Sequence, residues 1–311
     1  TSLPEDAGVL KTKIENAVAS FAGSAHMKGD ERFLFVLEDV SSKKLVGTAG
    51  VVAHVGIKHP FYSYKLSTIV QSSDVVGVYS LQKVLHMVND YTGASEIGSL
   101  FLLPDYRRDG IGKFLSRCRY LFMAQFPELF SDTVISEIRG VQDENGDSPF
   151  YRNLAGHFFQ MDFKKADFIT ATKGGQFISD LMPRYPIYVD LLDKKAQEVI
   201  GVPLEASKAA LHLLENEGFR HQGYIDVFDA GPTMQAERAQ IRTIRKSKKA
   251  KIAEIKELSG SAKFMLATVR LSDFRMGLGL LEEGKNGISV AADIAQTMGL
   301  RVGDEVRFVE A

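Results

Sequence analysis

Residues 104–115 read PDYRRDGIGKFL, and this stretch decides the fold because a strand, a glycine-rich turn and a helix meet in it. The apolar run LFLL at residues 100–103 precedes it and predicts a buried strand. Over residues 110–126 apolar side chains recur every three or four positions, which predicts an amphipathic helix with Arg117 and Arg119 off its apolar face. Glycines between two such elements indicate a backbone that closely approaches an anion.

Three phosphate-binding motifs could account for this junction. A Walker A loop fails twice, because Phe114 follows Lys113 and Arg107 takes the place of its first glycine. The dinucleotide motif Gly-x-Gly-x-x-Gly fails at Leu115. The motif Arg/Gln-x-x-Gly-x-Gly/Ala between a strand and a helix fits residues 107–112. A glycine-rich turn with solvated arginines is the alternative interpretation.

The fitting motif resembles the acyl-CoA-binding loop of the GNAT superfamily of N-acyltransferases. The resemblance implies that the loop holds the CoA pyrophosphate and that the strand before it pairs with the pantetheine amides. Free N–H groups at a helix N-terminus and arginine side chains suit such an anion. The implied CoA-binding residues are Leu100, Phe101, Leu102, Arg107, Arg108, Asp109, Gly110, Ile111 and Gly112.

Further strings resemble the arginine N-succinyltransferase family and are spread over most of the chain. They are TSLP (1–4), HPFYSYKLSTIV (59–70), GDSPFYRNLAGHFFQMDFKKADF (146–168), DLMPRYPIY (180–188), EGFRHQGYIDVFDAGPT (217–233), IRKS (244–247) and GDEVRFV (303–309). The resemblance implies transfer of a succinyl group from succinyl-CoA to the α-amine of L-arginine, the entry step of arginine catabolism. It implies direct attack in a ternary complex, and some relatives also take ornithine.

The chain departs from the family pattern in two places. Family members carry more chain before the TSLP string, so we expect the first strand to be absent here. The family's proton-donating histidine lies in a Gly-Gln-Val-His-Pro stretch, and the matching residues 201–205 read GVPLE, with Leu204 at that position. A leucine cannot transfer a proton. Either Glu205 takes over, another group does, or the activity has shifted or been lost.

Acyl transfer to an amine needs a base, and Glu137 is a second candidate. On a strand over residues 133–139, Glu137 and Arg139 point to one face. Glu137 could meet a cationic group of the substrate and Arg139 its carboxylate, but a structural Glu–Arg ion pair is an equal alternative. Ser148 precedes a predicted helix and is most simply its N-cap, although it could lie near the acyl group.

Composition limits the class of protein. The 311 residues, 45% hydrophobic and 25% charged, fit one large or two smaller globular domains, and a net charge of −1 means that any anion site is local. The single cysteine, Cys118, excludes an internal disulfide. No apolar run reaches the roughly 18 residues of a membrane span, and no signal peptide is evident. We therefore expect a cytoplasmic protein without a membrane partner.

The basic residues 242–251 carry six cations in ten positions, but they lack interleaved aromatic residues. A solvated linker is therefore favoured over a nucleic-acid site. No histidine or carboxylate spacing indicates a metal.

The expected fold is α+β, GNAT-like, with a mixed, mostly antiparallel sheet flanked by helices. We expect an acyltransferase domain over residues 1–240 and a basic linker with a small β-rich subdomain over residues 241–311. Predicted helices cover residues 3–21, 110–126, 149–159 and 207–217, and strands 32–38, 45–55, 64–71, 96–103, 133–139 and 224–229. Two rivals stay open: an impaired or regulatory subunit, and an acyltransferase for another amine such as ornithine. A homo- or hetero-oligomer is expected.

Overall fold

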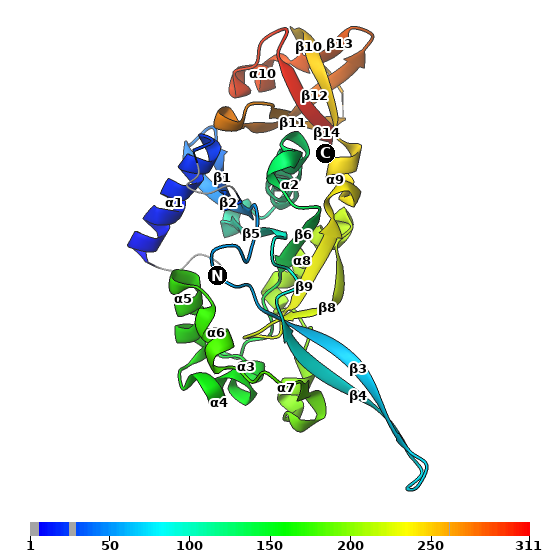
Figure 1. Ribbon diagram of the computed structural model, residues 1–311. Coiled ribbons are helices and arrows are strands. Elements are labelled where there is room, and N and C mark those ends of the chain that lie inside the picture. Colours follow the sequence, from blue (N-terminus) through cyan, green and yellow to red (C-terminus); the bar gives the residue numbers. More distant parts are fainter. Residues whose placement is uncertain (1–5, 25–28, 261) are drawn as a thin grey trace. The chain divides into compact units, whose positions relative to one another are not determined.

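The computed structural model describes residues 6–24, 29–260 and 262–311, so the TSLP string lies outside the described residues (Figure 1). The chain forms two compact units. Unit 1 contains Thr1–Lys11, His54–Gly98 and Thr133–Ala236, and unit 2 contains Thr12–Ala53, Ser99–Asp132 and Glu237–Ala311. Strand β5 (Ser95–Leu102) contributes its first half to unit 1 and its second half to unit 2.

Unit 1 is built on a mixed sheet. Its strands are β3 (Ser63–Ser73), β4 (Val78–Val88), β6 (Thr133–Glu137), β7 (Ile187–Tyr188), β8 (Arg220–Asp226) and β9 (Pro232–Glu237). They follow the first half of β5 in the order β6, β9, β8, β3, β4, β7. The β5–β6 pair is parallel, whereas β8–β9, β3–β8, β3–β4 and β4–β7 are antiparallel. The mixed sheet that the sequence predicts is therefore present, although β4, β7 and β9 were not predicted.

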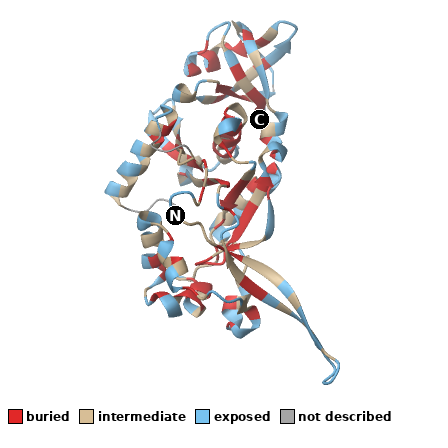
Figure 2. Cartoon of the chain, viewed as in Figure 1, coloured by how far each residue is buried: buried red, intermediate tan, exposed pale blue. Residues whose placement is uncertain are grey.

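Six helices belong to unit 1 among the described residues: α3 (Pro149–Asn153), α4 (Ala155–Phe159), α5 (Phe163–Lys173), α6 (Gln176–Leu181), α7 (Lys194–Glu198) and α8 (Lys208–Glu217). Buried side chains of α3 to α7 share one apolar core with Tyr64 of β3 and Leu85 of β4 (Figure 2). The predicted helix over residues 149–159 breaks at Leu154, whose φ of −129° and ψ of −83° are not helical. The helix predicted over residues 207–217 is confirmed as α8, which ends at Gly218 with a left-handed φ of 105°.

Unit 2 contains the predicted first hairpin. Strands β1 (Arg32–Asp39) and β2 (Lys44–Val52) pair antiparallel, and β2 neighbours the second half of β5. Helix α1 (Ala7–Phe21) begins later than predicted, because the carboxylate of Asp6 accepts the N–H of Val9 at 2.8 Å and acts as its N-cap. Phenylalanines from this part of the chain pack edge to face around Phe122 of helix α2 (Ile111–Gln125).

Helix α2 is enclosed on more sides than its sequence predicts. Arg117 and Arg119, which were predicted to lie off the apolar face, are nevertheless buried, with 6% and 2% of their surface exposed. The Arg117 guanidinium donates to Thr243 Oγ1 at 2.7 Å and to the Glu310 carbonyl at 2.9 Å. Burial raises the pKa of the Cys118 thiol on the same helix to about 12.

The C-terminal part of unit 2 is a closed five-stranded barrel. Its strands are β10 (Lys248–Lys256), β11 (Lys263–Thr268), β12 (Met276–Gly284), β13 (Gly287–Ala291) and β14 (Glu305–Glu310), in the order β10-β13-β12-β11-β14, with helix α10 (Ala292–Met298). The basic stretch interpreted as a linker folds as α9 (Arg242–Lys246) and the start of β10. Ile241 and Thr243 in it are fully buried. The domain division at residue 240 stays a prediction.

Short 3-10 segments complete the described structure: η1 (Pro104–Tyr106), η2 (Pro127–Leu129), η3 (Val189–Leu191), η4 (Glu205–Ser207), η5 (Arg238–Gln240) and η6 (Leu271–Asp273). Within the described ranges, the helices are all too short or too polar to cross a bilayer.

Replacing Arg117 with Met should lower the free energy of unfolding by about 3 kcal/mol, because Thr243 and the Glu310 carbonyl lose a charged donor. Urea unfolding measures the effect. Lys113 lies exposed on the same helix, so Lys113→Met is the matched control and should stay within about 0.5 kcal/mol of the wild type. Equal losses in the two variants would contradict a structural role for Arg117.

Candidate functional site

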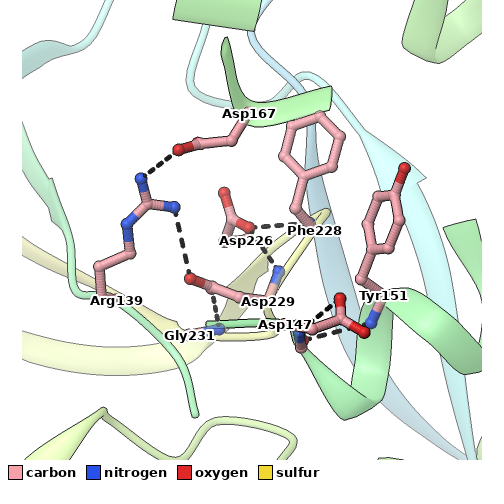
Figure 3. A network of polar contacts seen from close by, with 9 residues as sticks. Arg139, Asp147, Tyr151, Asp167, Asp226, Phe228, Asp229 and Gly231 are labelled. Carbon is pink, nitrogen blue, oxygen red and sulfur yellow. Dashed lines mark hydrogen bonds and ion pairs between the residues drawn. The ribbon is translucent and has the colours of Figure 1, made fainter. Parts of the chain in front are cut away.

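Arg139, just beyond the end of β6, is the centre of a polar network in unit 1 (Figure 3). Its guanidinium donates to Asp167 of α5 at 2.7 Å and lies 3.6 Å from the carboxylate of Asp229. The Asp229 side chain is only 1% exposed. Among the described residues, these two aspartates and not Glu137 lie within ion-pair distance of Arg139. The simple Glu–Arg pair considered as an alternative is thus replaced by a wider cluster.

A tight turn after β8 holds two of the carboxylates. One oxygen of Asp226 accepts the N–H groups of Phe228 at 2.7 Å and of Asp229 at 2.8 Å, and Asp229 in turn accepts the N–H of Gly231 at 2.9 Å (Figure 3). Such side-chain-to-backbone bonds define an Asx turn. The strand predicted over residues 224–229 is therefore wrong beyond Asp226, where β8 ends and this turn begins. The spacing Asp-x-x-Asp-x-Gly in DVFDAG was the available signal.

Two glycines bring this turn against the segment that follows β6. A Cβ on Gly140 would lie 2.1 Å from the Asp229 carbonyl oxygen, and a Cβ on Gly231 would lie 2.0 Å from the Ile138 carbonyl oxygen. Because real Cβ contacts are never this short, the two backbones can run this close only with glycine at both positions. The crossing fixes Arg139 beside Asp229.

The carboxylates of the cluster perturb one another. Burial raises the pKa of Glu137 well above its ordinary range, and nearby carboxylates add to the rise while Arg139 opposes it. These carboxylates are Asp226, Glu96 and Asp229. Burial and then Asp229 raise the pKa of Asp226 to about 7. The cluster therefore contains one acid, Asp226, that can exchange a proton near neutral pH, which suits general acid–base chemistry.

The stretch that departs from the family pattern lies beside Arg139. The N–H of Leu204 donates to the Arg139 carbonyl at 2.7 Å, and Pro203 forms an isolated bridge with Gly140. The next residue, Glu205, has a side chain that is 84% exposed and pairs with Lys208. The structure therefore brings the backbone of Leu204 to the cluster and leaves the Glu205 carboxylate in solvent.

Ser148 is fully buried at the start of α3. Its hydroxyl accepts the N–H of Tyr151 at 3.2 Å, which is the N-cap geometry that the sequence analysis gave as the simplest interpretation. The Tyr151 hydroxyl donates to the Met161 carbonyl at 3.0 Å. Both groups are thus used in holding the helices of unit 1.

Strand β5 diverges from β6 after a short parallel stretch. The paired positions are Ser95 with Val134 and Glu96 with Ile135. Beyond them the Ser136 hydroxyl, rather than a backbone amide, donates to the Ile97 carbonyl at 2.9 Å. Ser99 then takes a left-handed φ of 50°. A left-handed residue at this place in a strand is typical of a β-bulge.

The loop over residues 107–112 belongs to unit 2 and begins helix α2. Arg107 donates from Nε to the Leu102 carbonyl at 2.9 Å, which turns the loop back on β5. Asp109 and Gly110 have left-handed φ values of 52° and 76°, and no side chain caps α2. Arg108 is 72% exposed. The first turn of the helix thus combines uncapped N–H groups with an exposed guanidinium, as an anion site requires.

The turn of the β1–β2 hairpin supports this loop within unit 2. The hydroxyl of Tyr106 donates to Asp39 at 3.0 Å, and Asp39 also accepts from Ser41 and Ser42. The hydrogen bonds from Ser41 and Ser42, followed by that from Tyr106, hold the pKa of Asp39 well below its ordinary value. Among the described residues, no group of three or more His, Cys, Asp or Glu has the arrangement of a metal site.

Comparisons with known proteins cover both the cluster around Arg139 and the loop over residues 107–112. The family model described as arginine N-succinyltransferase beta subunit matches residues 1–243, and that of its C-terminal domain matches residues 248–310. An arginine N-succinyltransferase of Yersinia enterocolitica is 39% identical over 99% of this chain and 90% of the relative. One of Escherichia coli is 38% identical with the same coverage. A solved structure titled arginine/ornithine succinyltransferase subunit AI, from Pseudomonas aeruginosa, has a TM-score of 0.88 and 35% identity over 99% of this chain and 90% of that one.

Replacing Asp226 with Asn should change how stability depends on pH. The pKa of Asp226 is raised to about 7 in the folded chain, whereas it is about 4 in an unfolded chain. The contribution of Asp226 to the free energy of unfolding is therefore fully present below pH 4 and is lost as the pH rises through 7. The loss is on the order of 4 kcal/mol, because each pKa unit is worth about 1.4 kcal/mol. Asn keeps an oxygen for the two N–H groups, so the variant should gain in Tm on the wild type from pH 5 to pH 8.

Thermal unfolding across that range measures the difference. Asp190, exposed in η3 of the same unit, is the matched position, and Asp190→Asn should follow the wild-type profile. A parallel profile for Asp226→Asn would show that its carboxyl ionises at its ordinary pKa in the folded protein.

Proposed function

This chain belongs to the arginine N-succinyltransferase family, and we propose that it transfers the succinyl group of succinyl-CoA to the α-amine of L-arginine in arginine catabolism. The observation that carries the proposal is the acid cluster around Arg139, in which carboxylates outnumber cations. Four of them, Glu96, Glu137, Asp226 and Asp229, act electrostatically on one another. Such an excess of negative charge favours a ligand with two positive groups, as L-arginine has.

We place succinyl-CoA on the loop that begins helix α2. The uncapped helix start, the left-handed Gly110 and the exposed Arg108 support binding of its pyrophosphate there. The backbone of Leu100, Phe101 and Leu102 would pair with the pantetheine amides. The divergence of β5 from β6 and the irregular Ser99 support the GNAT-type fold in which a strand binds acyl-CoA in this way.

Arg139 would meet the substrate carboxylate from within the acid cluster. It is already paired with Asp167 and Asp229, which are 34% and 1% exposed. A carboxylate from solution would therefore compete with Asp167, the accessible partner, and leave the buried pair with Asp229 in place. In this arrangement Asp229 keeps the Arg139 guanidinium oriented, while the substrate carboxylate replaces Asp167 as its other partner.

In the reaction, Glu137 takes the proton of the α-ammonium group, and the neutral nitrogen attacks the thioester carbon. The thioester oxygen gains negative charge in this step, which hydrogen-bond donors would stabilise. The carbon–sulfur bond then breaks, the new amide nitrogen loses its remaining extra proton, and the CoA thiolate takes up that proton and leaves as the thiol. Glu137 suits the base because burial raises its pKa, which makes the carboxylate a stronger proton acceptor. Glu205 is the weaker candidate, since its side chain is solvated and paired with Lys208.

Ornithine is the second amine that we consider, because the related Pseudomonas aeruginosa protein is named an arginine/ornithine succinyltransferase subunit. Ornithine presents an ammonium group in place of the guanidinium, and a cluster of carboxylates can accept either cation. Competition between the two amines in one assay would rank them.

Release of free thiol from succinyl-CoA should depend on L-arginine and exceed release from acetyl-CoA. Glu137→Gln should lower kcat by 100-fold or more, the usual contribution of a general base, with little change in acyl-CoA affinity. Glu205→Gln is the matched control and should keep most of the turnover. Normal kinetics for Glu137→Gln with a large loss for Glu205→Gln would reverse the assignment, and no thiol release with either amine would refute the proposed function.

Gly112→Val should weaken binding of succinyl-CoA at least tenfold without unfolding the chain. A Cβ at Gly112 would meet nothing nearer than the Leu102 side chain at 3.9 Å, so the folded protein accommodates the valine. A pyrophosphate bound against the backbone of Gly112 would clash with the added side chain. Gly110→Val would be less informative, because its φ of 76° strains any β-branched residue. Calorimetry measures affinity and thermal unfolding checks the fold. Unchanged affinity would remove the loop from the CoA site.

A further inference from the structure

The outer half of the β3–β4 hairpin presents an apolar face to solvent. In the register of the hairpin Val70 lies opposite Leu81, and Ser72 lies opposite Tyr79, so these side chains share one face. Val70, Leu81 and Tyr79 are 59%, 60% and 70% exposed. The other face of the same segment is more polar, with Gln71 opposite Ser80. We call this outer half, residues 67–83, the arm.

The apolar face of the arm continues a face that is buried at the base of the hairpin. Leu66 lies opposite Leu85 and Tyr64 opposite Met87 on that same face. Tyr64 and Leu85 are fully buried in the core of unit 1, and Leu66 and Met87 pack against this core. Figure 2 shows the change from buried residues near the base to exposed ones toward the tip. The apolar face that helices cover at the base of the hairpin is thus exposed to solvent in the arm.

Both edges of the arm are also open. Strand β8 pairs with β3 only over Ser63–Lys65, and β7 pairs with β4 only at Val84 and Leu85. Within the described residues, the arm therefore has no strand neighbour other than itself (Figure 1). An isolated two-stranded ribbon is marginally stable in water, and a contiguous exposed apolar patch marks an interaction site.

The charges at the two ends of the apolar face identify what covers it. Asp74 in the turn is the only charged residue between positions 66 and 82, and Lys83 lies at the inner end, opposite Thr68. Both are exposed, and neither has an ion-pair partner among the described residues. Asp74 and Lys83 each lie three residues, or roughly 10 Å, from the centre of the patch at Gln71 and Ser80.

We propose that the arm is a self-association surface, on which the apolar face packs antiparallel against the same face of a second copy of this chain. A twofold axis through the centre of the patch brings Asp74 of each copy over Lys83 of the other. A parallel arrangement would instead oppose like charges. The net charge of −1 adds no long-range repulsion between copies.

Sedimentation of the full-length chain over a range of concentrations tests the apolar contact. The wild type should be a dimer, and Leu81→Asp should weaken the dimer at least about 100-fold, because twofold symmetry buries two unpaired carboxylates. Val78 is 51% exposed on the opposite face of the same strand. Val78→Asp is therefore the matched control and should leave the dimer intact.

A charge exchange tests the antiparallel register. Asp74→Lys and Lys83→Glu should each weaken the dimer roughly tenfold, because each places two like-charge pairs in the interface. The double variant should restore wild-type affinity. A monomeric wild type, a dimer that Leu81→Asp leaves unchanged, or a double variant weaker than either single one would each overturn the proposal. A monomer that captures a different protein through the arm would count among these failures.

Discussion

The close crossing of two backbone segments, residues 138–140 and 229–231, is the constraint on which the acid cluster depends. With glycine at positions 140 and 231 the carbonyl oxygens and N–H groups of the two segments approach to distances that no Cβ permits. The crossing places Arg139 against the buried Asp229. Because Asp229 is almost fully buried, the guanidinium of Arg139 at 3.6 Å supplies the positive charge that its surroundings otherwise lack. The turn held by Asp226 then follows from the same geometry.

The fold was predictable for elements whose hydrophobic periodicity and turn residues lie within one continuous segment of the chain. Helix α2 and the hairpin of β1 and β2 follow from periodicity and from a polar turn. The single helix predicted over residues 149–159 is wrong because the break falls at Leu154, a residue type with high helix propensity, and not at the nearby Gly156. The burial of Arg117 was hidden for another reason. Its partners, Thr243 and Glu310, lie more than 120 positions away in the sequence.

The candidate site also has one part that could be predicted from a continuous segment and one part that could not. The loop over residues 107–112 is one continuous stretch, so its glycines and arginines could be interpreted together. The cluster around Arg139 is assembled from β5, β6, α5 and the turn after β8, and its members become neighbours only in the folded chain. Glu137 was recognised from its strand face, but the influence of Asp226 on it depends on burial. Side-chain pKa values of this kind cannot be deduced from spacing.

The buried Cys118 has a consequence for an enzyme that releases CoA. Each turnover leaves a free thiol beside the protein, and an accessible cysteine thiolate would be open to mixed disulfides with oxidised CoA. Cys118 is the chain's single cysteine, and burial on α2 raises its pKa to about 12, so almost none of it is thiolate at neutral pH. Thiol–disulfide exchange needs both the thiolate and access to it. The protein surface is therefore chemically inert toward its own product.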